Sequence, residues 1–109
     1  MYVKPNPLAG TEFNTKTTGV DVMEYHDGWN HSHIVIAGVD PASPAAHLNI
    51  EPKDEVLKIN GVSATSLKLE TIRGILDGNN HAASVSIIIR KEIGRARELK
   101  LPLYDPLGS

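Results

Sequence analysis

The sequence predicts a mostly β fold with two helices, an α+β domain. Three observations predict it: short runs rich in β-branched residues, prolines and glycines that separate these runs, and one longer stretch with apolar residues at helical spacing. The length of 109 residues fits one compact domain. Hydrophobic residues make up 40% and charged residues 22%, which is typical of a chain that folds.

The first part of the chain predicts a linker followed by two paired strands. Residues 1–16 carry prolines and a glycine among polar residues, so we expect a linker or the tail of an upstream domain, with a short strand near 12–16. Side chains alternate between two faces over 19–25, which indicates a strand. The nearly continuous β-branched run at 34–39 indicates a strand buried on both faces. Because 26–30 is rich in turn-forming residues, these strands are expected to form a hairpin.

A short helix and a third strand are expected next. Ser43 before Pro44 offers an N-cap and a first-turn proline, which predicts a short helix through 45–47. Residues 56–59 then predict a short strand. The Asn-Gly pair at 60–61 predicts a tight reversal, since both residues tolerate a positive φ.

The second half predicts a long helix and two strands. Ser66 is placed to cap the helix, which is expected to stop near 78–79. Apolar residues line one side of this helix at intervals of three and four, namely Leu69, Ile72, Ile75 and Leu76. The last three of these are expected to pack in the core. Residues 85–89 predict a core strand, and alternating leucines at 97–103 predict a partly exposed final strand.

Charge and composition exclude several functions. Eleven Lys and Arg residues stand against 13 Asp and Glu, a net charge of −2, and no basic stripe is present that would bind a phosphate backbone. The absence of cysteine excludes disulfides, thiolate zinc sites and cysteine nucleophiles. Apolar runs such as 87–89 are too short to cross a bilayer, and no basic-then-apolar leader opens the chain. We therefore expect no nucleic acid partner, no membrane insertion and no cofactor.

Two segments resemble the signature of the PDZ family. Residues 39–46, VDPASPAA, and residues 54–61, DEVLKING, lie at the spacing that this family uses between its Ser-Pro-Ala-Ala turn and its Asn-Gly turn. The resemblance covers 17–103 and implies a partly open antiparallel β-barrel or sandwich capped by one short and one long helix. Residues 104–109 are then a frayed tail. Asn49 and Lys53 stand where the family carries glycine, so the loop before Asp54 is expected to follow a different path.

The resemblance also implies a peptide-binding site. In PDZ domains a peptide adds as a strand between a sheet edge and the long helix, and its terminal carboxylate binds backbone N–H groups of the preceding loop. That loop corresponds to 17–20, although Thr18 replaces the usual large apolar residue. Leu69 takes the first groove position of the helix and implies an apolar peptide side chain, while Arg73 either pairs with an acidic guest or lies in solvent. The implied site residues are Thr17, Thr18, Gly19, Val20, Asp21, Val22, Met23, Leu69 and Arg73.

The N-terminal segment YVKPN, at 2–6, resembles the tail of the retropepsin-like aspartyl protease domain that precedes PDZ domains in some exported bacterial proteins. This implies a multidomain parent protein in the periplasm or cell envelope. The aspartyl protease mechanism needs an Asp-Thr-Gly or Asp-Ser-Gly turn, which this sequence lacks. Any catalysis is therefore expected upstream, and the domain itself is not expected to be an enzyme.

Other polar residues have simpler interpretations than catalysis. The histidines at 31 and 33 lie near Asp27 and favour a solvated hairpin loop over a metal site, because no third ligand is set by spacing. Trp29 is interpreted as a lid over the edge of the core, with contact to a partner as the alternative. Asp54 is expected to satisfy backbone donors of its loop.

Three functions remain open. The first is a module that recruits or regulates a substrate or partner of an exported bacterial protease by binding a hydrophobic C-terminal or extended peptide. The second is a structural module whose groove is filled by its own chain or by a neighbour. The third, ranked last, is an enzyme or metal protein built on the histidine-bearing loop.

Overall fold

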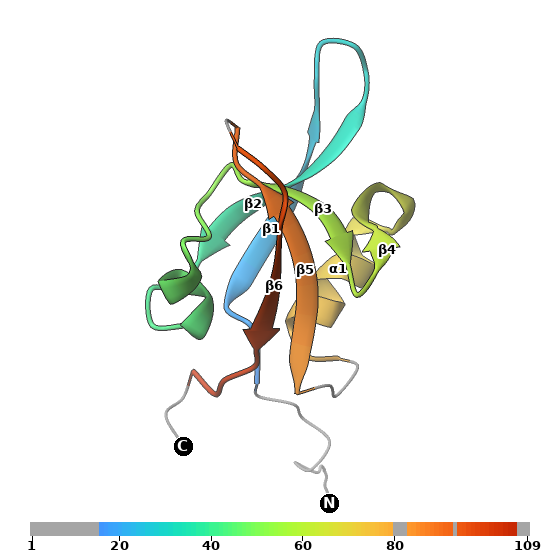
Figure 1. Ribbon diagram of the computed structural model, residues 1–109. Coiled ribbons are helices and arrows are strands. Elements are labelled where there is room, and N and C mark those ends of the chain that lie inside the picture. Colours follow the sequence, from blue (N-terminus) through green and yellow to red (C-terminus); the bar gives the residue numbers. More distant parts are fainter. Residues whose placement is uncertain (1–15, 80–82, 93, 107–109) are drawn as a thin grey trace, which may run out of the picture.

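A computed structural model describes residues 16–79, 83–92 and 94–106, and most of them build one antiparallel sheet (Figure 1). The sheet has six strands in these ranges, with the order β1-β2-β3-β5-β6, and β4 pairs with β3. The strands are β1 Val20–His26, β2 Ser32–Val39, β3 Glu55–Ile59, β4 Val62–Ser63, β5 Ser84–Arg90 and β6 Arg97–Pro102. The helices of the described residues are α1 Leu69–Leu76 and two 3-10 helices, η2 Pro44–Leu48 and η3 Ala64–Ser66. The prediction of a mostly β fold is confirmed.

The type of the short helix and the capping of both helices differ from the prediction. The expected short helix at 45–47 forms as the 3-10 helix η2, so α1 is the single α-helix of the described residues. Ser43 does not cap η2, because its hydroxyl donates backwards to the Asp40 carbonyl at 2.7 Å. Ser66 does not cap α1 either: it lies in η3 and donates to Ser63, and Lys68 is the N-cap residue of α1. Local serine hydrogen bonds thus tighten turns where helix caps were expected.

The strand β2 is buried on one face only, which corrects the prediction of burial on both. Ile34 and Ile36 are buried, whereas Val35 is half-buried and Ala37 is exposed. The β1–β2 hairpin extends beyond the body of the sheet (Figure 1), and no described helix covers its outer face. Of the short strand expected at 12–16, only Lys16 lies within the described residues, and it is not in a strand.

The core lies between the inner face of the sheet and α1. Ile72 and Leu76 of α1 are fully buried, and Ile75 is partly buried against the same cluster, as the spacing predicted. The central strands contribute side chains that are all within 1% of complete burial: Val56 and Ile59 of β3, and Val85, Ile87 and Ile89 of β5. None of the helices in the described ranges has the length and apolar character that crossing a membrane requires.

The two ends of the sheet are joined by Thr17 and Tyr104. Each backbone N–H donates to the other residue's carbonyl at 2.9 Å, which closes the curled sheet next to β1. The Tyr104 hydroxyl also donates to the Asp40 carboxylate, and this hydrogen bond raises the pKa of Tyr104 to about 12 and lowers that of Asp40. Tyr104 was expected in the frayed tail, but its backbone and its ring both contact the folded domain.

The loop before β3 keeps left-handed geometry without glycine. Asn49 has a φ of 60° and Lys53 a φ of 80°. Lys53 is held there because its N–H donates to the Ile36 carbonyl at 2.8 Å and the next carbonyl, of Asp54, accepts from Ile36 at 2.8 Å. The buried Asp54 carboxylate accepts from the Glu51 N–H at 3.0 Å and from Lys91 at 2.9 Å, so it satisfies backbone donors as expected.

Lys53→Gly is expected to stabilise the domain by about 0.5–1 kcal/mol. Relief of the left-handed conformation of a side-chain-bearing residue is worth about 1–2 kcal/mol, and the added flexibility of glycine in the unfolded chain offsets part of it. Urea denaturation measures the change. Lys58→Gly in β3 is the matched control and should destabilise, because Lys58 is already in an extended strand. A loss of stability in Lys53→Gly would contradict the assigned backbone geometry.

A candidate peptide groove between β1 and α1

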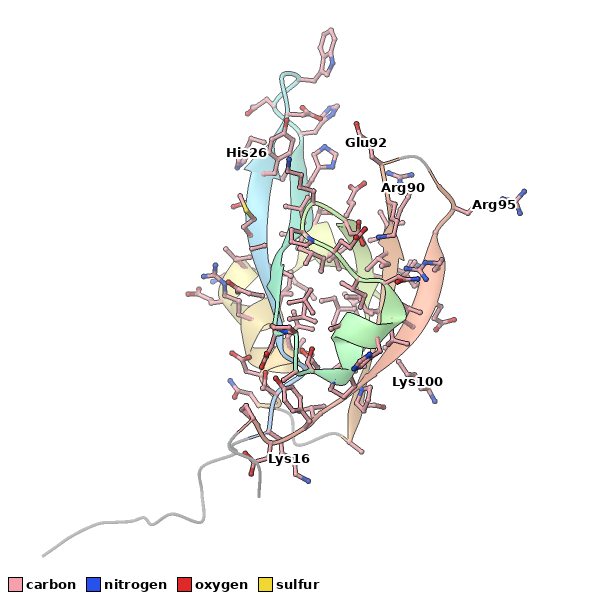
Figure 2. The ribbon with its side chains drawn as sticks, turned by 90° about the vertical axis from the view of Figure 1, so that its left-hand side faces the viewer. Lys16, His26, Arg90, Glu92, Arg95 and Lys100 are labelled. Carbon is pink, nitrogen blue, oxygen red and sulfur yellow. The ribbon has the colours of Figure 1, made fainter. Side chains whose placement is uncertain are left out.

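The strand β1 is an edge strand that lies alongside α1 (Figure 2). Within the described residues it pairs with β2 alone, in an antiparallel register that aligns Val22 with Ile36 and Tyr25 with His33. The Ile36 N–H and C=O both bond to the loop before β3, so Val22 and Ile36 do not bond to each other. The peptide groups of Val22 therefore point to the open edge of the sheet, toward α1.

A cleft of about 460 Å³ lies at the N-terminal end of α1. Leu69 and Arg73 of α1 line it together with Glu24 of β1, Ile34 of β2 and Leu67. Leu69 is half-buried and packs against the core cluster. The structure thus brings the two predicted helix residues to the same groove as the edge of β1. This arrangement places an apolar wall beside the edge of β1 that pairs with no other described strand, which is the geometry that strand addition requires.

The predicted carboxylate loop lies at the opposite end of α1, and its N–H groups already have acceptors within the chain. The Thr18 N–H donates to the Leu76 carbonyl at 2.8 Å, and the Gly19 and Val20 N–H groups donate to the hydroxyls of Thr17 and Thr18 at 3.1 and 3.3 Å. The Thr18 hydroxyl itself donates to Leu76 at 2.8 Å. Sequence reasoning missed these hydroxyls, although two adjacent threonines before the loop glycine were the available signal.

The three remaining β1 residues of the predicted site face different directions. The Val22 side chain is fully buried in the core, so only its backbone belongs to the groove. The Met23 side chain is 44% exposed and lies on the outer face, where it lines a second cleft of about 500 Å³ with Tyr25, Val35 and Pro52. Asp21 is exposed and faces α1, where it pairs with Arg73 at 3.3 Å.

Arg73 lies across the groove and bonds to the strand edge. Its guanidinium donates to the Val22 carbonyl, from Nη2 at 3.0 Å and from Nε at 3.3 Å. Nε is also 3.3 Å from Asp21 Oδ1. The same Asp21 oxygen accepts from the Val22 N–H at 2.9 Å. Neither interpretation of Arg73 from sequence included this contact with the strand edge.

The tip of the β1–β2 hairpin is held by His33. Its Nε2 is 2.9 Å from Asp27 Oδ2 and its Nδ1 is 2.8 Å from Glu55 Oε2, so both ring nitrogens face carboxylates. These two hydrogen bonds, first that with Asp27 and then that with Glu55, raise the pKa of His33, and the bond from His33 lowers the pKa of Asp27 to about 2. Trp29 is 84% exposed in this hairpin, so its interpretation as a lid is wrong. Among the described residues no group of three or more potential ligands is placed to hold a metal ion.

The His33 contacts predict a pH dependence of stability. Because the pKa of His33 is raised on folding, its contribution is fully present below its ordinary value of 6.5 and is lost as the pH rises through the higher folded value. Asp27 acts in the opposite sense, since its contribution is lost only as the pH falls through about 2. The difference in unfolding free energy between wild type and His33→Gln should therefore shrink as the pH rises above 6.5, the ordinary pKa of histidine. His47→Gln in η2 is the control. A difference that stays constant over this range would contradict the proposed ion pairs.

Comparison with known proteins assigns the fold to a family. Residues 12–90 match the family model of the PDZ domain, and the chain belongs to this family. PDZ domains are non-catalytic interaction modules, so this domain is not an enzyme. A solved structure titled photosystem II D1 C-terminal processing protease is similar, with a TM-score of 0.64 and 17% identity over 90% of this chain. The match spans 25% of that protease chain. No curated protein matches the sequence.

Proposed function

We propose that the domain binds an extended hydrophobic segment of another protein as an additional strand on β1. The observation that carries this proposal is the open edge of β1 beside α1, with Leu69 forming an apolar wall of the cleft. Main-chain hydrogen bonds along β1 would hold the segment, and the cleft at Leu69 would select one of its side chains. The affinity of such a short segment is expected to be roughly micromolar, because ordering it costs part of the contact energy.

The loop at 17–20 is where a PDZ domain would bind the C-terminal carboxylate of a guest peptide. The Gly19 and Val20 N–H groups already donate to threonine hydroxyls, and the Thr18 N–H donates to the Leu76 carbonyl. A terminal carboxylate at this loop would have to displace these acceptors. We therefore propose that the segment extends through the groove, and that a free carboxylate adds little to its affinity. Matched peptides with free and amidated C-termini distinguish the two modes.

We propose that the parent protein is an exported bacterial protease that uses this domain to recruit or regulate a substrate or partner. Two observations support a protease context: the similar fold in a processing protease, and the resemblance of 2–6 to the tail of a retropepsin-like aspartyl protease domain. The full-length gene tests this proposal, since an upstream Asp-Thr-Gly or Asp-Ser-Gly turn is expected for the aspartyl class. An extracytoplasmic location, in the periplasm or cell envelope, follows from the same proposal.

Leu69→Glu is expected to weaken binding of an apolar peptide at least about tenfold, because it places a carboxylate in the apolar part of the cleft. Fluorescence polarisation against a library of labelled peptides, with free and amidated C-termini, identifies the tightest wild-type binder and then measures the variant. Val62→Glu is the matched control, since Val62 is 45% exposed in β4 and does not line this cleft. Unchanged affinity in Leu69→Glu would contradict the groove assignment, and absence of binding by any library peptide would contradict the proposed function. Sedimentation that shows stable oligomers would favour the structural module instead.

A further inference from the structure

Val22 offers the groove one backbone N–H and one backbone C=O, and both are occupied by side chains of the same domain. Asp21 Oδ1 accepts from the N–H at 2.9 Å, and the Arg73 guanidinium donates to the C=O at 3.0 Å. In an added strand, a guest C=O would accept from this N–H and a guest N–H would donate to this C=O. The two side chains therefore make the hydrogen bonds that a guest backbone would make.

The two side chains also act as one unit. Arg73 Nε lies 3.3 Å from the Asp21 oxygen that holds the Val22 N–H, so the guanidinium joins both ends of the contact. Arg73 comes from the second turn of α1, and its side chain spans the groove from the helix to β1. A guest strand running between β1 and α1 would have to pass through this position.

We propose that Asp21 and Arg73 form a latch that closes the edge of β1 in the free domain and that a guest strand must displace. This inference rests on the proposed peptide-binding function and adds the step by which the groove opens. The guest exchanges its own backbone hydrogen bonds for those of the latch at Val22, so opening leaves no backbone group of Val22 unpaired. The latch thus lowers the affinity for every guest and protects an exposed strand edge from pairing with other chains.

Exposure of the two side chains sets the strength of the latch. The Arg73 side chain is 48% exposed and that of Asp21 is 63% exposed. Ion pairs in such positions contribute little net stability, because water and salt screen them and because the long arginine side chain must be ordered. The latch is therefore weak enough for a short peptide to open, and higher salt is expected to open it further.

The first test measures the latch without a guest. Amide hydrogen exchange followed by NMR reports the protection of the Val22 N–H. Asp21→Ala removes its acceptor, and we expect its exchange to become about tenfold faster, with a smaller increase in Arg73→Met, which keeps the apolar stem of the side chain but loses the guanidinium. Arg95→Met is the control for loss of one positive charge, since Arg95 is exposed in the turn between β5 and β6 (Figure 2). An unchanged Val22 exchange rate in Asp21→Ala would overturn the latch.

The second test measures binding of the tightest library peptide to the same variants by fluorescence polarisation. The latch predicts that Arg73→Met binds about three- to tenfold more tightly than wild type, and that the gain in Asp21→Ala does not add to it, because both changes open the same contact. Weaker or unchanged binding by Arg73→Met, with binding by wild type intact, would overturn the latch alone, and weaker binding would make Arg73 a contact of the guest. Absence of binding by wild type and all variants would overturn both the latch and the proposed function.

Discussion

Ile59→Ala is expected to lower the free energy of unfolding by about 2–5 kcal/mol, the usual cost of a cavity left by a large aliphatic side chain. Ile59 is 1% exposed in β3, where it is aligned with Ile87 of β5 on one side and with Val62 of β4 on the other. Because three strands meet at this position, the surrounding backbone has little freedom to fill the space. Urea denaturation followed by circular dichroism measures the loss.

Val62→Ala is the matched control for Ile59→Ala, since Val62 belongs to the neighbouring strand and is 45% exposed. Its truncation is expected to cost less than about 0.5 kcal/mol. A cost below about 1 kcal/mol for Ile59→Ala would show that this part of the core is not packed as the structure has it.

Gly19→Ala is expected to destabilise the domain by about 2–4 kcal/mol, through two additive effects. Gly19 has a φ of +78°, which costs a residue with a side chain about 1–2 kcal/mol. An added Cβ would also lie 2.6 Å from Ser43 Cβ and 3.1 Å from a ring carbon of Tyr104, so the neighbouring loop has to move. Thermal and urea denaturation measure the change.

Gly38→Ala provides the control in the strand paired with this region. Gly38 of β2 is aligned with Asp21 of β1, and a Cβ added at Gly38 would have nothing within 4 Å. Its effect on the free energy of unfolding is expected to be below about 1 kcal/mol. Equal effects of the two substitutions would contradict the close approach of Gly19 to Ser43.

The elements that were predicted well are those in which the chain's own pattern decides the structure. The β-branched run at 85–89 became β5 Ser84–Arg90, and the Asn-Gly pair at 60–61 forms the reversal with φ values of 50° and 82°. The spacing of Ile72 and Leu76 identified the buried face of α1. Leu69, Arg73 and the edge of β1 lie at one groove, and their binding of a peptide stays a prediction.

The features that were missed depend on contacts between distant segments. Trp29 was expected to cover the core because it is large and aromatic, yet the hairpin projects beyond the sheet and leaves it 84% exposed. The contact of Arg73 with Val22 joins residues 51 positions apart, and that of the Thr18 hydroxyl with Leu76 joins residues 58 apart. No local pattern reports such pairs, since each requires the helix and the strand to be placed first.

Binding of a guest at the open edge of β1 is tested most directly by NMR. A titration of the nitrogen-15-labelled domain with the tightest library peptide maps the amides whose chemical shifts change. We expect the largest changes at Val22 and Glu24 of β1 and at Leu69 and Arg73 of α1. Changes confined to the outer cleft, at Tyr25 and Val35, would contradict it.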